Sequence, residues 1–333
     1  MVLIIAEAGV NHNGDIVIAK KLVDAAKKCG ADIIKFQIYN ADDLVIPSTS
    51  KAFYQKRDDK ENETQYEMLK KLELNFDEQK ELKNYCDEIN IEFLSSAFDL
   101  ESLAFIKEMK LKRYKIPSGE ITNLPYLRFI GAQKKPLLLS TGMSNILEIH
   151  AAILELLKAG ANKKDITILH CTTEYPAPFE DINLRALKTI RDYFDLEVGY
   201  SDHTLGLEVS VAAVALGAKV IEKHITLDRN LNGPDHKASL EPDQFYNLVK
   251  SIRNISLALG DTKKDITNSE INNLKIVRKS IIAKKDIKKG ELFSKDNLCT
   301  KRPGTGISPM RWDEIIGTTS TRNFKKNQLI ILN

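Results

Sequence analysis

The sequence predicts an α/β protein in which a (β/α)8 barrel is followed by a small β-rich domain. Short apolar runs alternate with amphipathic stretches through the first 260 of the 333 residues. Strands that alternate with helices form a parallel sheet with right-handed crossovers. Eight such units within about 260 residues match the size of a closed barrel. After Leu259 the alternation stops, so a second domain is expected.

Each strand candidate is a short run of apolar residues. The eight predicted strands are residues 2–9, 32–39, 91–98, 113–120, 135–142, 165–172, 196–202 and 218–226. Residues 15–30 and 145–160 have helical periodicity and end in glycine, as helices commonly do. A doubly wound open sheet is the structural alternative, but no G-x-G-x-x-G phosphate-binding motif follows the first strand.

The end of the chain has a different pattern. Residues 261–275 are polar and are predicted to be a linker between the barrel at 1–260 and a domain at 276–333. This last segment has short alternating runs, a "KKGE" turn and a loop rich in Gly and Pro. It is too short for another barrel unit and is typical of a small β-rich domain.

Composition excludes several classes of protein. The net charge is only +3, from 49 basic and 46 acidic residues, so neither nucleic acid nor a membrane is an expected partner. Four widely spaced cysteines, with no C-x-x-C pair, indicate reduced thiols. The apolar start lacks the basic region of a signal peptide, and no run is long enough to span a membrane. A cytoplasmic protein is expected.

Polar residues gather where the predicted strands end. These residues are Glu7, Asn11, Lys35, Gln37, Ser95, Ser96, Lys115, Ser118, Glu120, Ser140, Thr141, Thr172, Thr173, Ser201, Asp202, His203, Glu222 and His224. The carboxyl ends of barrel strands meet at one mouth, where barrel enzymes carry out their chemistry. The segment "CTTEYPAP" is the sixth strand-to-helix loop, and its prolines stiffen one wall of that mouth. A site is predicted there.

Two histidines suggest a metal. His203 and His224 end the seventh and eighth predicted strands, which are neighbours in a barrel. Two imidazoles on adjacent strand ends can bind one divalent cation and leave positions open for water and substrate. The alternative is a pair of unrelated surface histidines. Glu222 lies two residues before His224 and faces the same way; it either orients the ligands or fills a barrel layer.

Two strand-end lysines, Lys35 and Lys115, suggest an anionic substrate. With Ser96, Ser118 and Ser201 they could bind a phosphate and a carboxylate, although either lysine could extend to solvent or form a Schiff base. Glu7 and Glu120 are candidates for acid–base catalysis, while Glu7 could instead anchor a loop.

From the residues alone we expect a metal-assisted lyase or synthase that acts on a small phosphorylated or carboxylated substrate. Walker-type and G-x-S-x-G motifs are absent from the sequence. Two rival interpretations are a Schiff-base aldolase, which would tolerate chelators, and a non-catalytic carbohydrate-binding barrel.

Nine motifs in order resemble the sialic acid synthase family. They are "IIAEAGVNHNGD", "ADIIKFQ", "KIPSGEITNLP", "STGMSN", "HCTTEYPAP", "GYSDHT", "IEKHITLD", "GPDHKASLEP" and "TKRPGTGIS". Enzymes of that family condense phosphoenolpyruvate with an N-acylated mannosamine-type sugar. The resemblance covers the whole chain, and the tail is similar to the family's antifreeze-protein-like (SAF) domain.

The resemblance implies a role for each candidate residue. His203 and His224 would hold Mn²⁺ or Mg²⁺, with Glu222 behind them. Glu7, Lys115 and Glu120 form the implied catalytic group. The implied substrate-binding residues are Lys35, Gln37, Ser96, Phe98, Ser118, Thr173, Tyr175, Ser201, Asp235 and Arg302. Ser96 keeps the hydroxyl of the Thr that many members have, whereas Thr173 replaces their Asn.

Arg302, in "KRPG", matches an arginine that the tail domain inserts into the mouth of a partner subunit, which implies a domain-swapped homodimer. On the loop alone Arg302 would be a surface residue in a basic tail. Arg302 would orient the N-acyl group of the sugar.

The family resemblance leaves two main products. The first expectation is N-acetylneuraminate from open-chain N-acetylmannosamine, phosphoenolpyruvate and water, with phosphate released by C–O cleavage. The alternative is legionaminate from 2,4-diacetamido-2,4,6-trideoxymannose, and pseudaminate is a weaker one. "GPDHKAS" and "RPGTG" resemble the neuraminate and legionaminate branches more than the pseudaminate branch.

Overall fold

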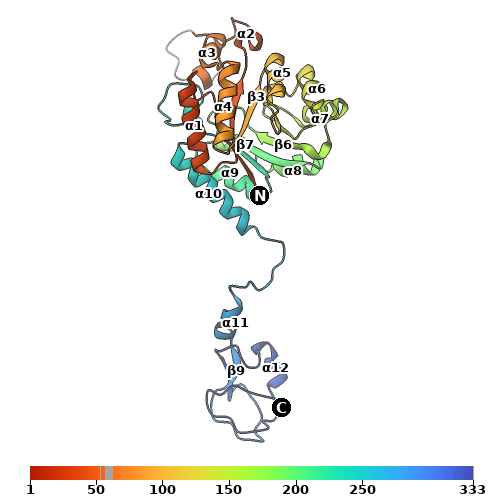
Figure 1. Ribbon diagram of the computed structural model, residues 1–333. Helices are drawn as coiled ribbons and strands as arrows, with labels where there is room; N and C mark the ends of the chain where they lie inside the picture. The colour runs from red at the N-terminus through yellow and green to blue at the C-terminus, as the bar shows by residue number, and fades with distance from the viewer. Residues whose placement is uncertain (53, 57–62, 333) are drawn as a thin grey trace. The chain divides into compact units, whose positions relative to one another are not determined.

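The computed structural model describes residues 1–52, 54–56 and 63–332, which form two units, Met1–Gly260 and Asp261–Asn333. Within the described part of the first unit, eight parallel strands form one sheet in the order β3-β2-β1-β8-β7-β6-β5-β4 (Figure 1). The strands are β1 (Leu3–Gly9), β2 (Ile33–Ile38), β3 (Glu92–Ala97), β4 (Tyr114–Ile116), β5 (Leu137–Ser140), β6 (Ile166–Cys171), β7 (Glu197–Asp202) and β8 (Val220–His224). The two end strands, β3 and β4, lie against each other, so the sheet closes into the predicted barrel.

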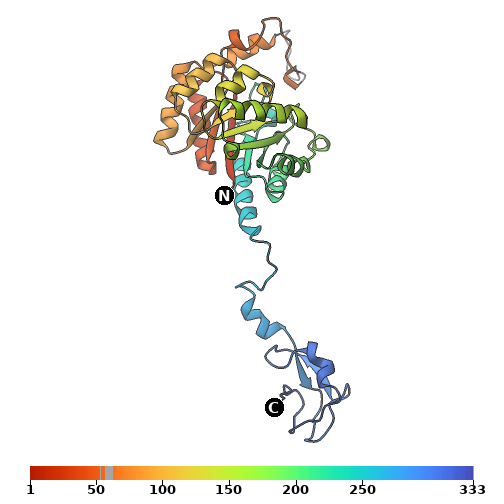
Figure 2. The same ribbon diagram turned by 90° about the vertical axis from the view of Figure 1, so that its right-hand side faces the viewer.

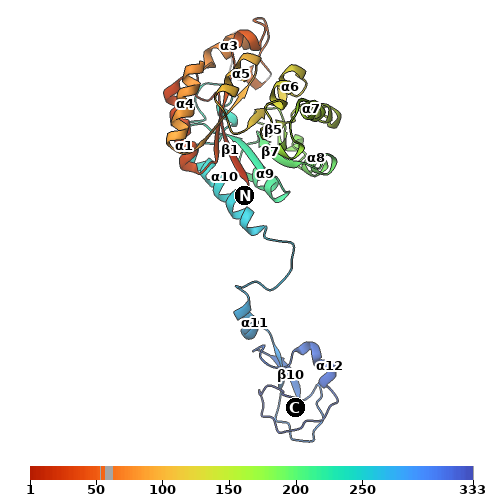
Figure 3. The ribbon, with the colours of Figure 1, turned by 45° about the vertical axis from the view of Figure 1, so that its right-hand side comes forward.

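Helices surround the strands, as Figures 2 and 3 show from two further directions. The outer helices are α1 (Ile16–Cys29), α4 (Phe76–Glu88), α5 (Leu100–Glu108), α6 (Leu124–Gly131), α7 (Ile146–Ala159), α8 (Ala186–Phe194), α9 (Glu208–Ala215) and α10 (Pro242–Ala258). The connection from β2 to α4 carries two more helices, α2 (Ala41–Leu44) and α3 (Gln65–Leu72). Short 3-10 turns span Tyr54–Lys56, Ser118–Glu120, Lys163–Asp165, Phe179–Asp181 and His236–Ala238.

Local sequence signals set the ends of these helices. The Asp15 side chain accepts hydrogen bonds from the first turn of α1, and Asn145 with Glu148 forms a capping box at α7. Gly30 and Gly160 end the same two helices with left-handed backbone. The ends of α1 and α7 are therefore set by their own residues.

The fourth strand is shorter than its predicted range of 113–120. It ends at Ile116, and Ser118–Glu120 form a 3-10 turn instead. Pro117 lies between them and has no N–H to continue the ladder. Ser118 and Glu120 are consequently placed by a turn and not by strand alternation.

The barrel core is apolar up to the carboxyl ends of the strands. In β1, Ile4, Ile5, Ala6 and Ala8 are fully buried, and the other strands contribute similar runs. Both faces of a parallel barrel sheet are covered, which is why such runs are nearly continuous. Buried polar residues such as Glu7 appear only as the strands approach the mouth.

The second unit is small and β-rich. Strands β9 (Ser280–Ala283) and β10 (Leu298–Lys301) pair antiparallel, and single bridges add Leu292, Phe324 and Leu329. Its core contains Ile281, Ala283, Ile287, Phe293, Leu298, Ile315, Phe324 and Ile330. Helix α11 (Ile271–Val277) makes the end of the predicted linker helical; a 3-10 turn (Pro309–Arg311) and α12 (Trp312–Ile315) follow. Asn333, the last residue of the predicted domain, lies outside the described residues.

Among the described residues, no helix is both long enough and apolar enough to cross a bilayer.

Candidate active site

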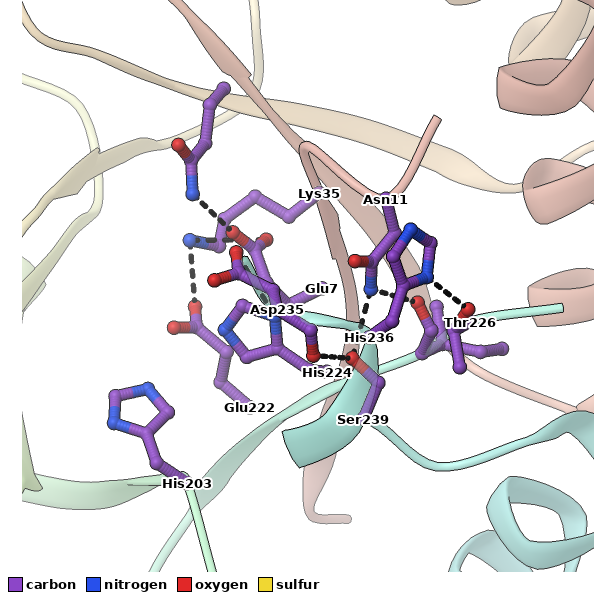
Figure 4. Close-up of polar contacts among 12 residues, drawn as sticks. Glu7, Asn11, Lys35, His203, Glu222, His224, Thr226, Asp235, His236 and Ser239 are labelled. Atoms are coloured by element: carbon purple, nitrogen blue, oxygen red, sulfur yellow. Dashed lines mark hydrogen bonds and ion pairs between the residues drawn. The ribbon is translucent and has the colours of Figure 1, made fainter. Parts of the chain in front are cut away.

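A cluster of four charged side chains lies inside the mouth of the barrel. Lys35 Nζ is 3.2 Å from Glu7 Oε2 and 3.3 Å from Glu222 Oε2, and Lys115 Nζ is 3.2 Å from Glu222 Oε1. Figure 4 shows Lys35 between the two carboxylates. All four side chains are almost fully buried. We call Glu7, Lys35, Lys115 and Glu222 the charged quartet.

Strand register brings the quartet together. Glu7 pairs with Lys35 across β1 and β2, and Ser201 pairs with Glu222 across β7 and β8. Lys115 reaches the same carboxylate from β4, on the other side of the barrel. Residues of one barrel layer come from strands far apart in sequence, so a pattern of polar strand ends becomes a cluster in space.

Burial and charge pull the quartet's pKa values in opposite directions. Burial raises the pKa of Glu7 to about 7, although Lys35 opposes the shift. Burial also acts to raise the pKa of Glu222, but Lys115 and Lys35 together outweigh it, so this pKa is lowered. Burial acts to lower the pKa of Lys35, yet Glu222 and Glu7 raise it overall, whereas burial lowers the pKa of Lys115. Glu222 is ionised and Glu7 titrates near neutrality.

Hydroxyl groups surround the quartet. Ser201 Oγ donates to Glu222 Oε1 at 2.8 Å, and Lys35 Nζ donates to Ser96 Oγ at 3.3 Å. Ser118 Oγ accepts from the Gly142 backbone N–H at 2.9 Å and lies 3.3 Å from Cys171 Sγ. Lysines with serine hydroxyls form a surface that can bind phosphate and carboxylate oxygens.

The two histidines lie side by side next to the quartet. The ring centroids of His203 and His224 are 5.6 Å apart, and both side chains are buried. His203 Nδ1 lies 2.6 Å from the Thr172 carbonyl oxygen, so it donates there and leaves Nε2 as the lone-pair nitrogen. His224 Nδ1 is buried without a hydrogen-bond partner among the described residues.

These two imidazoles suit a divalent cation. Burial lowers the pKa of His203 to about 4, and burial with the neighbouring His203 lowers the pKa of His224 well below its usual range. Neutral rings keep the lone pairs that a metal needs. The described residues contain no cluster of three or more protein ligands for a metal ion, so water or substrate oxygens would fill the other positions.

Tyr175 packs against both histidines. Its ring centroid lies 4.1 Å from that of His203 and 5.6 Å from that of His224. Tyr54, from the connection between β2 and α4, packs against Tyr175 with the two rings tilted and their centroids 4.8 Å apart. The histidine pair thus has aromatic neighbours.

Gln37 and Asp235 flank Glu7 and His224. Gln37 Nε2 is 3.4 Å from Glu7 Oε1, and Asp235 Oδ2 is 3.9 Å from His224 Nδ1. Burial raises the pKa of Asp235 to about 6. Figure 4 places Asp235 beside Glu7 and His224.

A hydrogen-bonded chain holds the loop that carries Asp235. Asn11 Nδ2 donates to the Ile225 carbonyl at 2.9 Å and to Ser239 Oγ at 2.8 Å, and Ser239 Oγ donates to the Asp235 carbonyl at 2.7 Å (Figure 4). This chain ties the segment after β1 to the loop that follows β8, and so fixes the backbone of Asp235.

Three other predicted site residues contact neighbours outside the charged quartet and the histidine pair. The Glu120 carboxylate accepts a hydrogen bond from Asn123 Nδ2 at 2.6 Å, and burial raises its pKa. Phe98 packs edge-on against Tyr39, with centroids 6.4 Å apart. Arg302 belongs to the second unit, where its Nε donates to the Val277 carbonyl at 2.9 Å.

A cavity of about 270 Å³ opens beside this polar machinery. Gln37, Tyr175, His224 and Asp235 line one part of it, and residues of α2 and α3 line another. A small sugar bound there would lie against His224.

Comparison with known proteins assigns the family. The model of the NeuB family matches residues 22–264, and the model of the SAF domain matches residues 278–331. The chain belongs to the NeuB family. It is 55% identical to the N,N'-diacetyllegionaminic acid synthase of Campylobacter jejuni over 328 residues, which are 98% of each chain.

Two further relatives agree with this family assignment. The N,N'-diacetyllegionaminic acid synthase of Legionella pneumophila is 46% identical over 98% of this chain and 93% of its own. A solved structure of the N-acetylneuraminic acid synthetase of Leptospira borgpetersenii matches with a TM-score of 0.71 and 34% identity, covering 82% of this chain and 90% of that one. The predicted resemblance is confirmed: this NeuB-family protein is an enzyme of the sialic and legionaminic acid synthase group.

Sequence reasoning missed several neighbours of the site in this NeuB-family barrel. Tyr54 lies far from any strand end, and its contact with Tyr175 depends on how the long connection after β2 folds. The Thr172 carbonyl that orients His203 carries no side-chain signal at all. The unusual length of the connection between β2 and α4 was the one feature that could have pointed to Tyr54.

Proposed function

We propose that this enzyme is an N,N'-diacetyllegionaminic acid synthase. It condenses phosphoenolpyruvate with open-chain 2,4-diacetamido-2,4,6-trideoxymannose and water, and releases phosphate. The observation that carries the chemistry is the buried charged quartet next to a pair of neutral histidines. The sugar assignment is supported by the 55% and 46% identical relatives, both named for this product.

The choice of sugar reverses the order expected from sequence alone. N-acetylneuraminate was the first expectation and legionaminate the alternative. Both products belong to the same synthase group, and full-length similarity to two legionaminic acid synthases favours the second.

Phosphoenolpyruvate would bind at the lysines of the quartet. Lys35 and Lys115 supply positive charge, while Ser96, Ser118 and Ser201 supply hydroxyl groups for its phosphate and carboxylate. An anion placed there favours the ammonium form of Lys115 and offsets the effect of burial. In a buried site these interactions are stronger than they would be in water. Thr173 Oγ1, buried without a hydrogen-bond partner among the described residues, is a further donor available to the substrate.

His203 and His224 would hold a manganese or magnesium ion, which when bound supplies Lewis-acid polarisation of the sugar aldehyde. The protein residues do the rest. Tyr175 covers the histidines, and Asp235 and Gln37 stand where sugar hydroxyl and amide groups can reach them. Glu222 keeps both lysines in place behind the reacting atoms.

Glu7 is the proposed proton donor. Carbon C3 of phosphoenolpyruvate attacks the aldehyde carbon, and Glu7 gives its proton to the oxygen that becomes the new hydroxyl. Water then adds to C2 and returns one proton to the Glu7 carboxylate. The hydroxyl that remains on C2 becomes the carbonyl as the bond from C2 to the bridging oxygen breaks, and phosphate leaves with that oxygen and the second proton. A carboxyl group with a pKa of about 7 is protonated often enough to act at neutral pH. Glu120 is proposed as a second acid–base group near the sugar, since burial raises its pKa too.

Two further proposals concern the whole protein. We propose a domain-swapped homodimer in which Arg302 of one chain enters the barrel mouth of the other; the exposed Gly/Pro-rich loop that carries Arg302 supports it. A cytoplasmic location stays a prediction.

Product formation from two sugars tests the function. Phosphate release from phosphoenolpyruvate is measured with Mn²⁺ and either 2,4-diacetamido-2,4,6-trideoxymannose or N-acetylmannosamine. We expect the first sugar to react far faster, chelation to stop the reaction and Mn²⁺ to restore it. Faster turnover of N-acetylmannosamine would make the enzyme a neuraminate synthase. Insensitivity to chelation together with trapping by borohydride would favour a Schiff-base aldolase.

A further inference from the structure

The cavity beside the histidine pair has two chemically different ends. His224, Tyr175 and Asp235 line the polar end. The other end is an apolar wall, which we define as Val10, Leu44, Met68, Leu69, Leu72 and Phe98. The reaction described above uses only the polar end, so the wall has no part in the chemistry.

Helix α3 contributes three residues of this wall, and local sequence signals position the helix. Leu72 lies three positions after Leu69 and four after Met68, and residues at these two spacings lie on one face of a helix. A capping box between Thr64 and Glu67 starts the helix. Tyr39 then ties it to the end of β2, because its hydroxyl donates to the Leu69 carbonyl at 3.2 Å.

The wall leaves apolar surface open to the cavity. Met68 and Leu72 are buried, while Leu44, Leu69 and Phe98 are only partly buried and pack around them. Apolar groups that face a small cavity next to an active site are a place for apolar parts of a ligand. Phosphoenolpyruvate, which is small and highly charged, does not match such a surface.

We propose that the apolar wall binds the C6 methyl and the C4 acetamido methyl of the sugar, and thereby selects the diacetamido trideoxy sugar over N-acetylmannosamine. This inference rests on the proposed function. With the aldehyde at His224, the chain from C4 to C6 extends away from the histidines, toward α2 and α3. The amide groups of Gln55 and Gln65 line the same cavity and can serve the polar atoms of the acetamido group.

The same wall disfavours the hydroxylated sugar. N-acetylmannosamine places hydroxyl groups at C4 and C6, and a hydroxyl against apolar side chains loses its hydrogen bonds to water without replacement. Discrimination by one methyl-sized group in an apolar pocket is worth roughly 10- to 200-fold. The wall therefore favours the diacetamido sugar in two ways. It contacts the methyl groups of that sugar, and it leaves the hydroxyl groups of N-acetylmannosamine without hydrogen-bond partners.

Polar substitutions in the wall test the inference. Met68→Gln keeps the length of the side chain but places an amide in the wall, and Leu44→Gln does so at a partly buried position that is less critical for folding. Leu147→Gln is the matched control, because Leu147 is 74% exposed on α7 and lies outside the cavity lining. For each protein, kcat/KM is measured with both sugars at saturating phosphoenolpyruvate.

We expect both wall variants to lower the ratio of kcat/KM between the diacetamido sugar and N-acetylmannosamine by roughly tenfold or more, with no change in Leu147→Gln. General damage to the fold would lower both rates together and leave the ratio unchanged. An unchanged ratio in Leu44→Gln and in any folded Met68→Gln protein would overturn the inference. A wild-type enzyme that prefers N-acetylmannosamine would instead overturn the proposed function.

Discussion

Glu7 has an ionisable side chain that is as deeply buried as an apolar residue of the core. Its exposure is only 2%, and its neighbours are two lysines and the Glu222 carboxylate. Because burial favours the neutral form, the group can hold a proton near pH 7, where an ordinary carboxyl group has lost it. The proposed reaction depends on that proton.

Glu7→Gln tests the raised pKa through stability. A carboxyl group whose pKa rises from 4.5 to about 7 on folding binds more protons in the folded state, so it weakens folding as pH increases across that window. Glutamine does not titrate, so the variant is spared this loss. The free energy of unfolding of Glu7→Gln minus that of the wild type should therefore rise by on the order of 3 kcal/mol between pH 4.5 and 7. Urea titrations at several pH values measure the difference.

Asp235→Asn provides the control for this pH window. The pKa of Asp235 is raised from 3.8 to about 6, so its effect on stability should be complete by pH 6. A difference between Glu7→Gln and wild type that stays constant from pH 4.5 to 7 would show that Glu7 titrates normally.

At the level of single residues, sequence identified most of the charged site. Glu7, Lys35, Lys115 and Glu222 lie within β1, β2, β4 and β8, and the inward-facing residues of one barrel layer converge whatever the details of packing. Glu120 belonged to the same prediction, but Pro117 ends the strand early and a 3-10 turn places Glu120 near Asn123. Tyr54 and the wall residue Met68 gave no such signal, because loop packing alone brings them to the site.

Among the secondary-structure elements, the loop after β5 packs closely on the loop after β6. A Cβ added at Gly142 would lie 2.1 Å from Thr173 Oγ1 and 2.9 Å from Ser118 Oγ. Both hydroxyl groups belong to the proposed phosphoenolpyruvate site, so this glycine keeps room for them.

Gly142→Ala should displace Thr173 and Ser118 and raise KM for phosphoenolpyruvate by about tenfold, as expected for the loss of one hydrogen bond to a charged group. Steady-state kinetics with varied phosphoenolpyruvate measure this. Gly119→Ala is the matched control, because a Cβ there meets no atom within 4 Å. Equal KM values for the two variants would contradict the proposed contact.

A buried ion pair also joins strands β7 and β8, and a hydrogen bond from helix α9 reaches the same carboxylate. Lys223 Nζ is 2.9 Å from Asp202 Oδ2, both side chains are fully buried, and Ser210 of α9 donates to the same carboxylate. These residues alternate with Ser201, Glu222 and the histidines, so they point out of the barrel toward the helix. The pair fixes the strand ends that carry the histidines.

Lys223→Met should destabilise the protein by about 3–5 kcal/mol, because it leaves Asp202 buried and unpaired. The double variant Asp202→Asn, Lys223→Met should recover part of this loss. Denaturant unfolding followed by circular dichroism measures both. A loss below about 1 kcal/mol, the range of surface pairs, would show that water reaches the pair.

Sequence alternation correctly separates Lys223 from its neighbours Glu222 and His224, but it does not reveal a partner. In "IEKHITLD" this lysine looks like a solvated side chain. Only the packing of α9 over β7 and β8 buries it against Asp202. Strand periodicity thus predicted the side of β8 to which Lys223 points, whereas tertiary packing determines that Lys223 is buried in an ion pair.

At the scale of the whole molecule, the chain combines a barrel with a SAF domain. Each unit has its own apolar core, centred on the barrel strands in one and on residues such as Ile281 and Phe293 in the other. The barrel carries the quartet and the histidines, while Arg302 lies in the second unit. A swapped dimer would supply this arginine from the partner chain.

Mixing two impaired variants, assayed at a sugar concentration below the raised KM, tests the swap. Arg302→Ala should raise KM for the sugar by tenfold or more, as expected for a lost charged hydrogen bond, and Lys115→Met should abolish turnover. In a swapped heterodimer, the barrel of the Arg302→Ala chain receives an intact arginine from the Lys115→Met chain. Refolded mixtures should therefore show activity well above the sum of the two proteins assayed separately. Activity equal to that sum would mean that each barrel uses its own tail.

The fate of the bridging oxygen of phosphoenolpyruvate tests the central claim most directly. Phosphoenolpyruvate labelled with oxygen-18 between C2 and phosphorus is turned over with 2,4-diacetamido-2,4,6-trideoxymannose and Mn²⁺, and both products are analysed by mass spectrometry. The proposed reaction places the label in inorganic phosphate, because water adds to C2 and the C–O bond breaks. Label retained in the sugar acid would show P–O cleavage and contradict the proposed reaction at this site.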